Sequence, residues 1–239
     1  LSRGLGDVYK RQIGKWLEES GPGDILVFAQ DVIPYSAYEI TPTNEDSKLK
    51  RFLERGGVIV WTGDAPFYYR IRCFSEWGWI NETKKLFENY VKYTAIPKFY
   101  IEKFGPYYRG NELCIMDIIG GFYTEPNKVT WISLEYEHLG FLKLGNVCYL
   151  PSPTFAKTTI LGRLLEYNQT VTVRPIRISV KMFPLTYVKL NGICSGKYAG
   201  AWIAEVGNGY FVRLYDVKDA IDPENVFRIA EKISNTIKI

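Results

Sequence analysis

The stretch LKRFLERGGVIVWTGD (residues 49–64) places a helical pattern, a glycine pair and an unbroken apolar run one after another. Leu49, Phe52 and Leu53 share one face of a helix, and Gly56-Gly57 is a strong signal for its end. Residues 58–61 then have the composition of a strand buried on both faces, because no polar residue interrupts them. This stretch predicts a helix followed directly by a core strand.

A second apolar run lies upstream, in ILVFA (residues 25–29), after Gly21-Pro22-Gly23 and Asp24. Residues 13–20 are typical of the end of a helix, and residues 44–47 offer several capping side chains for the helix that follows. A strand, a helix and a strand joined by short links form a right-handed parallel unit by default. The first part of the chain is therefore expected to be an α/β domain.

The C-terminal part carries equally clear signals. Two strand-like runs, residues 201–206 and 210–214, flank Gly207-Asn208-Gly209, which is typical of a β-hairpin. Asp222 is expected to cap a last helix whose first residue is Pro223. That helix would place one apolar stripe toward the core: Val226, Ala230, Ile233 and Ile237.

The middle of the chain, from about residue 75 to 175, is expected to be a β-rich insertion or lid. Residues 81–93 have helical spacing, residues 98–150 contain several strand-like pieces, and residues 158–167 predict a short helix. Residues 13–239 are thus expected to form a single domain with this insertion.

Three segments together carry a family resemblance: GDILVFAQD (23–31), LKRFLERGGVIVWTGD (49–64), and AWIAEVGNGYFVRLYD with DPENVFRIAEKI (201–216 and 222–233). In this order they resemble the class I glutamine amidotransferase-like superfamily, closest to its ThuA-like and β-galactosidase trimerisation-like branches. The resemblance covers about 24–66 and 198–236. It implies a three-layer, flavodoxin-like α/β fold with a mostly parallel sheet, truncated at its N-terminus, whose first strands lie before residue 13.

The chain departs from that family at its reactive positions. Amidotransferases carry a cysteine on a sharp turn, but Thr62-Gly63-Asp64 follows the glycine-pair strand here, and Tyr215-Asp216 stands where ThuA-like domains often carry Gly-His. The resemblance therefore implies a domain without the Cys-His-Glu triad.

The segment SRGLGDVYKRQ (residues 2–12) resembles a conceptual translation of a transposase-based sequencing adapter, and residues 1–12 are therefore excluded from the fold argument. The formal net charge of +4 is partly due to this segment. No run of Lys and Arg follows a phosphate backbone, and no apolar run reaches the length of a membrane span. We therefore expect no nucleic-acid and no membrane partner, no cofactor, and a cytoplasmic location in preference to others.

Four cysteines, at positions 73, 114, 148 and 194, are widely spaced and do not form a zinc pattern. Free buried thiols are the favoured interpretation, and two disulfides are the alternative. Residues 192–196, GICSG, match a nucleophile elbow by letters, but the one histidine, His138, lies upstream, so a loop with a free thiol is favoured over catalysis. Glu135 and Glu137 share one strand face while His138 takes the other, which argues against a metal site.

The best candidate site residues follow the two predicted parallel strands. Asp31 and Asp64 come just after them, and ligands of open α/β sheets bind beyond the carboxyl ends of the strands. Thr62 and Gly63 would add backbone N–H groups beside Asp64, and two further side chains stand next to Asp31: Gln30 and Tyr35. The alternative is that both aspartates only cap turns.

Three functions remain open. The first is a ligand-binding or accessory domain for a small molecule, with a carbohydrate suggested by paired carboxylates and an aromatic content of 15%. The second is a glycosidase-like hydrolase that uses two carboxylates as acid and base. The third is a homo-oligomerisation module of a carbohydrate-active protein.

Overall fold

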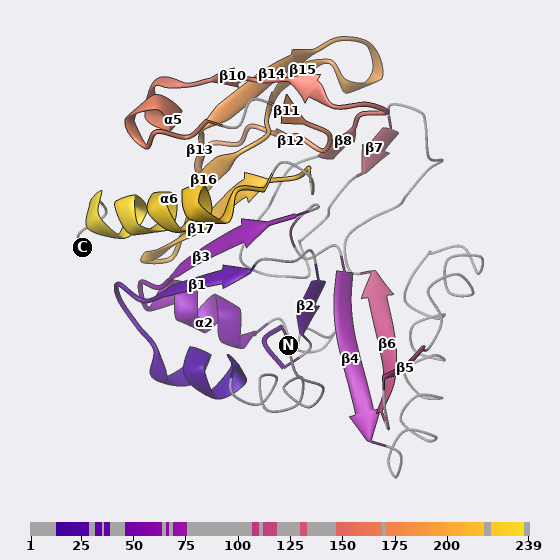
Figure 1. The fold of residues 1–239 in the computed structure, drawn as a ribbon, viewed down its shortest axis with the longest axis vertical. Helices are drawn as coiled ribbons and strands as arrows, with labels where there is room; N and C mark the ends of the chain where they lie inside the picture. Colours follow the sequence, from indigo (N-terminus) through magenta and orange to yellow (C-terminus); the bar gives the residue numbers. More distant parts are fainter. Residues whose placement is uncertain are drawn as a thin grey trace.

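The helix and strand of the opening stretch lie at the centre of the molecule. The computed structural model describes residues 13–28, 32–34, 36–38, 46–63, 66, 69–75, 107–109, 112–118, 130–132, 147–168, 171–217 and 221–236. Within them, a five-stranded sheet, here called the central sheet, has the order β1-β3-β17-β16-β13 (Figure 1).

The central sheet is mixed. Strands β1 (Ile25–Phe28), β3 (Val58–Thr62) and β17 (Gly209–Tyr215) run parallel to one another. Strands β16 (Trp202–Val206) and β13 (Met182–Pro184) are added antiparallel at one side. The chain thus starts this sheet as a parallel unit and completes it with hairpin-type pairings.

Helices pack on both faces of the central sheet. Helix α2 (Lys48–Glu54) buries Leu49, Phe52 and Leu53 in the same cluster as Ile59 and Trp61. Helix α6 (Pro223–Thr236) buries its apolar stripe with Val58 and Val60, which point to the opposite face because side chains alternate along a strand. Residues 13–19 are also helical, and Trp16 lies against Phe52 with ring centroids 5.4 Å apart.

A six-stranded antiparallel sheet, here called the outer sheet, lies beyond β13 and β16. Its order is β10-β14-β15-β12-β8-β7. The strands are β10 (Lys157–Thr158), β14 (Thr186–Leu190), β15 (Gly196–Ala199), β12 (Ile176–Arg177), β8 (Val147–Tyr149) and β7 (Thr130–Ile132). Helix α5 (Ile160–Leu164) and the short 3-10 helix η2 (Gly192–Cys194) connect them, and β9 (Thr154–Phe155) pairs with β11 (Val171–Thr172).

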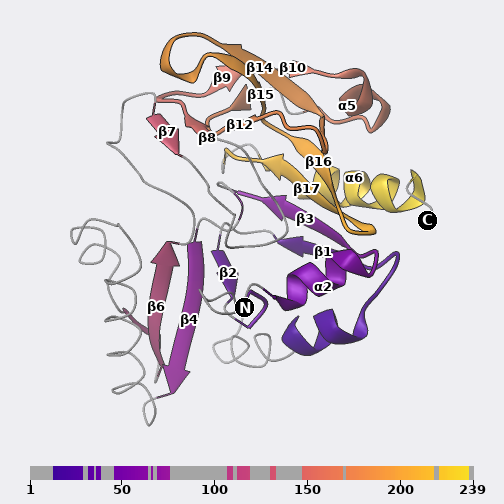
Figure 2. The ribbon, with the colours of Figure 1, turned by 180° about the vertical axis from the view of Figure 1, so that it is seen from behind.

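A third group of strands lies at the other end of the molecule. Strand β2 (Val32–Pro34) pairs parallel with β4 (Tyr69–Ser75), which pairs antiparallel with β6 (Glu112–Ile118) and through it with β5 (Tyr107–Arg109). Both ribbon views place the central sheet between this group and the outer sheet (Figures 1 and 2).

This architecture corrects the expected fold class. A flavodoxin-like molecule would have one mostly parallel sheet, whereas the described residues form several sheets that are mostly antiparallel, with few helices. The expected fold class was wrong because it assumed that the parallel pattern of the β1–α2–β3 unit continues through the whole chain. Strands β7 and β8 lie within the strand-like pieces expected at residues 98–150. The strands of residues 154–199 are two to five residues long, so local patterns do not predict them, and their pairings join distant segments.

The local predictions around that unit are confirmed. Ser47 caps α2, since its Oγ accepts a bond from Lys50 N (3.0 Å), and Gly56 has the positive φ of +99° expected at a helix end. The hairpin β16–β17 turns at residues 207–208, and Asp222 Oδ1 accepts from Glu224 N (3.1 Å) at the start of α6. The helix expected at 81–93 lies outside the described residues, and the boundaries of the insertion at 75–175 stay a prediction.

Candidate functional site

The carboxyl ends of the three parallel strands are joined at one edge of the central sheet. Thr62 Oγ1 donates a hydrogen bond to Phe28 O (2.8 Å), which links the end of β3 to the end of β1. Gly63 N donates to Tyr215 O (2.6 Å), which links β3 to the end of β17. The segments that follow β1, β3 and β17 therefore leave the sheet at neighbouring points.

This edge is where the sequence places its candidate site, and two of its six residues are described. Thr62 is buried and its hydroxyl proton is directed at β1, while the N–H of Gly63 is directed at β17. The Thr62 hydroxyl and the Gly63 N–H therefore bond to neighbouring strands of the sheet and do not point outward. Four residues lie outside the described part of the chain, so their placement stays a prediction: Gln30, Asp31, Tyr35 and Asp64.

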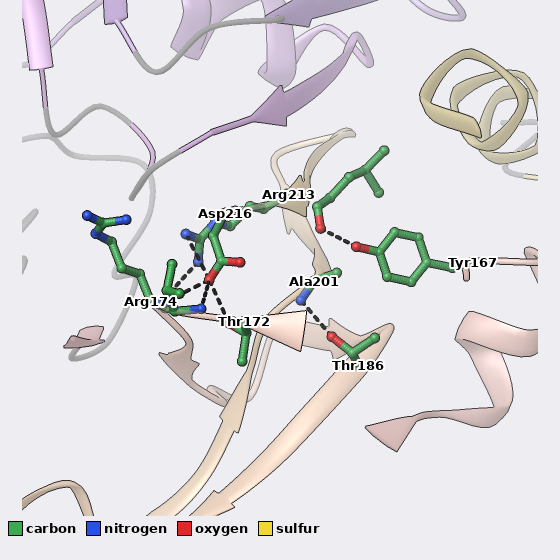
Figure 3. A network of polar contacts seen from close by, with 9 residues as sticks. Tyr167, Thr172, Arg174, Thr186, Ala201, Arg213 and Asp216 are labelled. Carbon is green, nitrogen blue, oxygen red and sulfur yellow. Dashed lines mark hydrogen bonds and ion pairs between the residues drawn. The ribbon is translucent and has the colours of Figure 1, made fainter. Parts of the chain in front are cut away.

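Asp216 is a buried carboxylate at the same edge, directly after β17. Its side chain is 2% exposed. Oδ2 accepts three hydrogen bonds, from Thr172 Oγ1 (2.5 Å), Val173 N (3.0 Å) and Arg174 N (2.7 Å) (Figure 3). Since Thr172 belongs to β11, this one oxygen fixes the segment before β12 to the end of β17.

Arg213, three residues earlier on β17, supplies the compensating charge. Its side chain is fully buried, its Nη1 donates to Arg174 O (2.6 Å), and its Nη2 lies 3.8 Å from Asp216 Oδ2. The register of β17 against β3 shifts between Arg213 and Tyr215, as at a β-bulge. This irregularity lies within β17, between Arg213 and Asp216.

Arg174 adds a second guanidinium to this cluster. Its backbone N and O hold Asp216 and Arg213, and its guanidinium lies over the ring of Tyr149, 4.8 Å from the centroid. Cation–π contacts of this kind stabilise a defined side-chain position. The edge therefore holds two oriented guanidinium groups, those of Arg213 and Arg174, and the buried carboxylate of Asp216. These three residues are here called the Arg213–Asp216 cluster.

Two tyrosines next to the cluster are held in the neutral form. Tyr167 OH donates to Leu214 O, and burial raises its pKa well above the usual range, with smaller effects from Tyr215 and Asp216. Burial likewise raises the pKa of Tyr215, whose hydroxyl accepts a bond from Asn225 Nδ2. Neither phenol can serve as a base near neutral pH, so both act as structural hydrogen-bond partners.

The cluster was not predicted from sequence. In the sequence, Tyr215-Asp216 stands out only as a departure from a family pattern, and Arg213 belongs to the predicted strand at residues 210–214. The available signal was a charged residue inside the buried run YFVRLYD (210–216), followed by an acid three positions later. A charge within such a run needs a buried partner.

Cys194 is not a free thiol. It forms a disulfide with Cys148 (Cα–Cα 6.1 Å), and both residues are fully buried. This corrects the favoured interpretation of unpaired thiols, and it leaves the elbow-like GICSG without a nucleophile, because a disulfide sulfur carries no thiolate. On the other side of the molecule, Cys73 of β4 stands directly opposite Cys114 in the β6 register.

No group of three or more His, Cys, Asp or Glu residues that could hold a metal occurs among the residues that the structure describes. Glu135, Glu137 and His138 lie outside that part, so the argument against a site there still rests on their spacing. No helix of the described chain is long and apolar enough to cross a membrane.

Comparison with known proteins gives a partial match at the N-terminal side. A model of the MJECL34 family matches residues 6–86. The Methanocaldococcus jannaschii protein named "Uncharacterized protein MJECL34" is 39% identical over 61 residues, which are 25% of this chain and 20% of that protein. The chain thus spans about a fifth of that relative's length. No solved structure matches.

These findings correct the family expectation as well as the fold class. The matching family is MJECL34, and the described fold is rich in antiparallel strands. The amidotransferase-like, ThuA-like and flavodoxin-like assignments are therefore withdrawn. The matched range includes β1 and β3, two of the three strands that end at the candidate edge, but not β17.

Proposed function

We propose that this chain is a ligand-binding domain, or an accessory domain of a larger protein, whose ligand is a small polar molecule. The ligand would sit beyond the carboxyl ends of β1, β3 and β17. The observation that carries the proposal is the Arg213–Asp216 pair, a buried charge pair at the edge of the sheet where β1, β3 and β17 end.

A buried ion pair is a weak explanation of stability. Removing two charges from water costs several kcal/mol per ion, and apolar residues of the same volume often do as well or better. Buried charged groups with fixed hydrogen bonds occur in structural networks and also at functional sites, where they orient ligands. Here the three hydrogen-bond donors of residues 172–174 and the guanidinium of Arg213 all contact Asp216 Oδ2. The carboxylate is therefore held in one orientation.

Carbohydrates are the ligand class that we propose to test first. Carboxylates accept hydrogen bonds from hydroxyl groups, and guanidinium groups donate to them, so the two kinds of side chain together suit a molecule with vicinal hydroxyls. Asp31, which follows β1 in the sequence, and Asp64, which follows β3, would supply the carboxylates, and Arg174 a guanidinium. The large aromatic side chains Trp61, Trp202 and Tyr215 belong to the core, so the proposal assigns them no stacking role.

The test is a binding screen of purified protein against common mono- and disaccharides by saturation-transfer NMR, followed by calorimetry of any sugar that binds. We expect Asp31→Asn and Asp64→Asn each to weaken binding at least about tenfold, the loss of one charge-assisted hydrogen bond. Asp24→Asn is the matched control, because Asp24 precedes β1 at the opposite end of the strand. If no sugar binds at millimolar concentration, the carbohydrate class is rejected.

Hydrolysis of nitrophenyl glycosides by the same variants separates binding from catalysis. A glycosidase needs two carboxylates at catalytic separation, and loss of either abolishes turnover. Binding without turnover supports the ligand-binding domain. Turnover that Asp31→Asn and Asp64→Asn both abolish, but Asp24→Asn leaves intact, would replace it with the hydrolase.

An oligomerisation role has one observation in its favour. Phe227 is 64% exposed on the last helix, α6. A single aromatic side chain is a small area compared with the roughly 800 Å² per partner that a stable interface buries. Light scattering after size-exclusion chromatography decides the matter: a multimeric mass that Phe227→Ser reduces to a monomer would support this role.

A further inference from the structure

The segment around the outer sheet has an unusual charge composition. Residues 138–204 contain one acidic residue, Glu166, and eight basic residues: Lys143, Lys157, Arg163, Arg174, Arg177, Lys181, Lys189 and Lys197. Glu166 itself is engaged, since it pairs with Arg228 and Lys232 of α6. Seven of the eight basic residues, all but Lys143, belong to the described part of the chain.

Strand register brings three of these lysines to one face of the outer sheet. Lys189 of β14 stands directly opposite Lys197 of β15, and Lys157 of β10 stands opposite Tyr187, two residues from Lys189. The alternate residues face the other way, into the buried cluster that contains the disulfide: Ala156, Val188 and Tyr198. All three lysines are exposed.

These lysines have no acidic partner in the described part of the chain. None of its ion pairs includes Lys157, Lys189 or Lys197. Like charges directly opposite each other in a sheet are destabilising. An arrangement that keeps Lys189 beside Lys197 without a counter-charge is suited to an external anionic partner.

Exposed apolar side chains flank Lys157 in the chain. Phe155 is 82% exposed and stands two residues before Lys157, on the same side of the extended chain because Ala156 between them is buried. Ile160 and Leu164 of α5 are 75% and 72% exposed. Gly162, midway between them, faces the carbonyl of Leu185, so Ile160 and Leu164 project from the opposite side of α5.

We propose that this part of the surface docks onto an anionic lipid bilayer. We call it the β10 surface and define it as Phe155, Lys157, Ile160, Leu164, Lys189 and Lys197. The lysines would attract anionic headgroups, while the exposed Phe, Ile and Leu side chains enter the boundary between headgroups and acyl chains. Such a peripheral contact needs no spanning segment, which is why hydropathy alone indicates no membrane partner.

The apolar side chains favour a bilayer over a nucleic acid. Lysines alone suit either polyanion, but aliphatic side chains such as Ile160 and Leu164 gain free energy only when they leave water for an apolar medium. A nucleic acid would instead call for exposed rings on which bases stack. By strand register, two tyrosines of the described strands share the lysine face, Tyr187 of β14 and Tyr149 of β8, and both are half-buried.

The test is co-sedimentation of the whole chain with vesicles of phosphatidylcholine, with and without one-third phosphatidylglycerol, at low and high salt. We expect salt-sensitive binding to the anionic vesicles only. Lys189→Gln with Lys197→Gln should weaken it roughly 25-fold, about fivefold for each charge. Lys15→Gln with Lys50→Gln, the same change of charge on helical segments far from the outer sheet (Figure 1), should have little effect.

A second pair of variants tests the contribution of the exposed apolar side chains to vesicle binding. Phe155→Ser should weaken vesicle binding about tenfold, as expected when one aromatic side chain stays in water, whereas Phe227→Ser on α6 should not. Circular dichroism and the thermal midpoint confirm that each variant is folded.

Equal binding to neutral vesicles, no binding to anionic ones, or equal losses in the test and control variants would overturn the proposal. Retention by a single-stranded 20-nucleotide DNA without vesicle binding would assign the surface to nucleic acid instead. Sugar binding is measured on a different set of residues, so either proposal can fail without the other.

Discussion

At the residue scale, Asp216 shows that this fold depends on hydrogen bonds between distant segments, which local sequence patterns do not predict. One carboxylate oxygen collects donors from residues 172–174, more than forty positions earlier in the chain (separations of 42 to 44). Sequence reasoning found Thr62 and Gly63 by their position after a strand, yet their donors turn inward. It missed Asp216 because the need for a buried partner appears only when both segments are in place.

The Arg213–Asp216 pair gives the first prediction. Asp216→Asn should lower the free energy of unfolding by about 3–5 kcal/mol, because it leaves a buried guanidinium without its counter-charge. Asp222→Asn should change it by less than about 0.5 kcal/mol, since Asp222 is an exposed helix cap and Asn caps equally well. The double variant Arg213→Met with Asp216→Asn should be less destabilised than Asp216→Asn alone. Urea denaturation measures all three, and a double variant that is as unstable as Asp216→Asn or less stable would contradict the pairing.

Tyr167 gives a prediction about alkaline pH. Its pKa is raised by burial, so the folded state holds the phenolic proton more tightly than the unfolded state, whose pKa is about 10. Stability is therefore fully present below about pH 10 and is lost as the pH rises above it. Tyr167→Phe should be less stable near neutral pH, because the bond to Leu214 O is absent, but its stability should fall less steeply above pH 10. Equal slopes would show that Tyr167 does not titrate with unfolding.

At the element scale, the sequence predicted the parts whose signals are local and continuous. The β1–α2–β3 unit, the β16–β17 hairpin and the start of α6 follow from apolar runs, glycine pairs and caps. The outer sheet could not be predicted in the same way. Strands such as β10 and β12 have two residues each, and they exist only because β14, β15 and β8 lie beside them.

Gly209 tests how closely the hairpin packs on α2. A Cβ at this position would lie 2.2 Å from Gly57 O and 2.4 Å from Leu53 O, both of them backbone atoms that cannot rotate away. Gly209→Ala should therefore lower the unfolding free energy by at least about 2 kcal/mol, as overpacking does. Gly21→Ala is the control, because nothing lies within 4 Å of its Cβ. If the two alanine variants melt at the same temperature, β17 does not approach α2 as closely as described.

At the scale of the whole molecule, the net charge does not show how the charged residues are distributed. A net charge of +4 suggests nothing unusual, yet one acidic residue among residues 138–204 leaves the outer sheet strongly basic. This asymmetry was readable from the sequence. Counting runs of Lys and Arg missed it because the lysines are spread over strands and meet only through strand pairing.

The arrangement of sheets also predicts how stability is distributed. Strands β3 and β17 lie in the middle of the central sheet and contribute to buried clusters on both of its faces, whereas the outer sheet has a small cluster of its own around the Cys148–Cys194 disulfide. We expect the amides of β3 and β17 to exchange slowest with deuterium and those of β9 and β11 fastest, because protection follows buried apolar contacts.

Reduction of the Cys148–Cys194 disulfide should then destabilise the outer sheet before the central sheet. The disulfide joins residues 46 apart, and a loop of that length corresponds to roughly 4 kcal/mol of chain entropy. Dithiothreitol should therefore speed exchange in β8, β14 and β15 while β3 and β17 keep their protection, as measured by mass spectrometry of proteolytic fragments. Faster exchange of all five strands together would mean that the two sheets unfold as one unit. The disulfide would then stabilise the candidate ligand edge as well as the β10 surface.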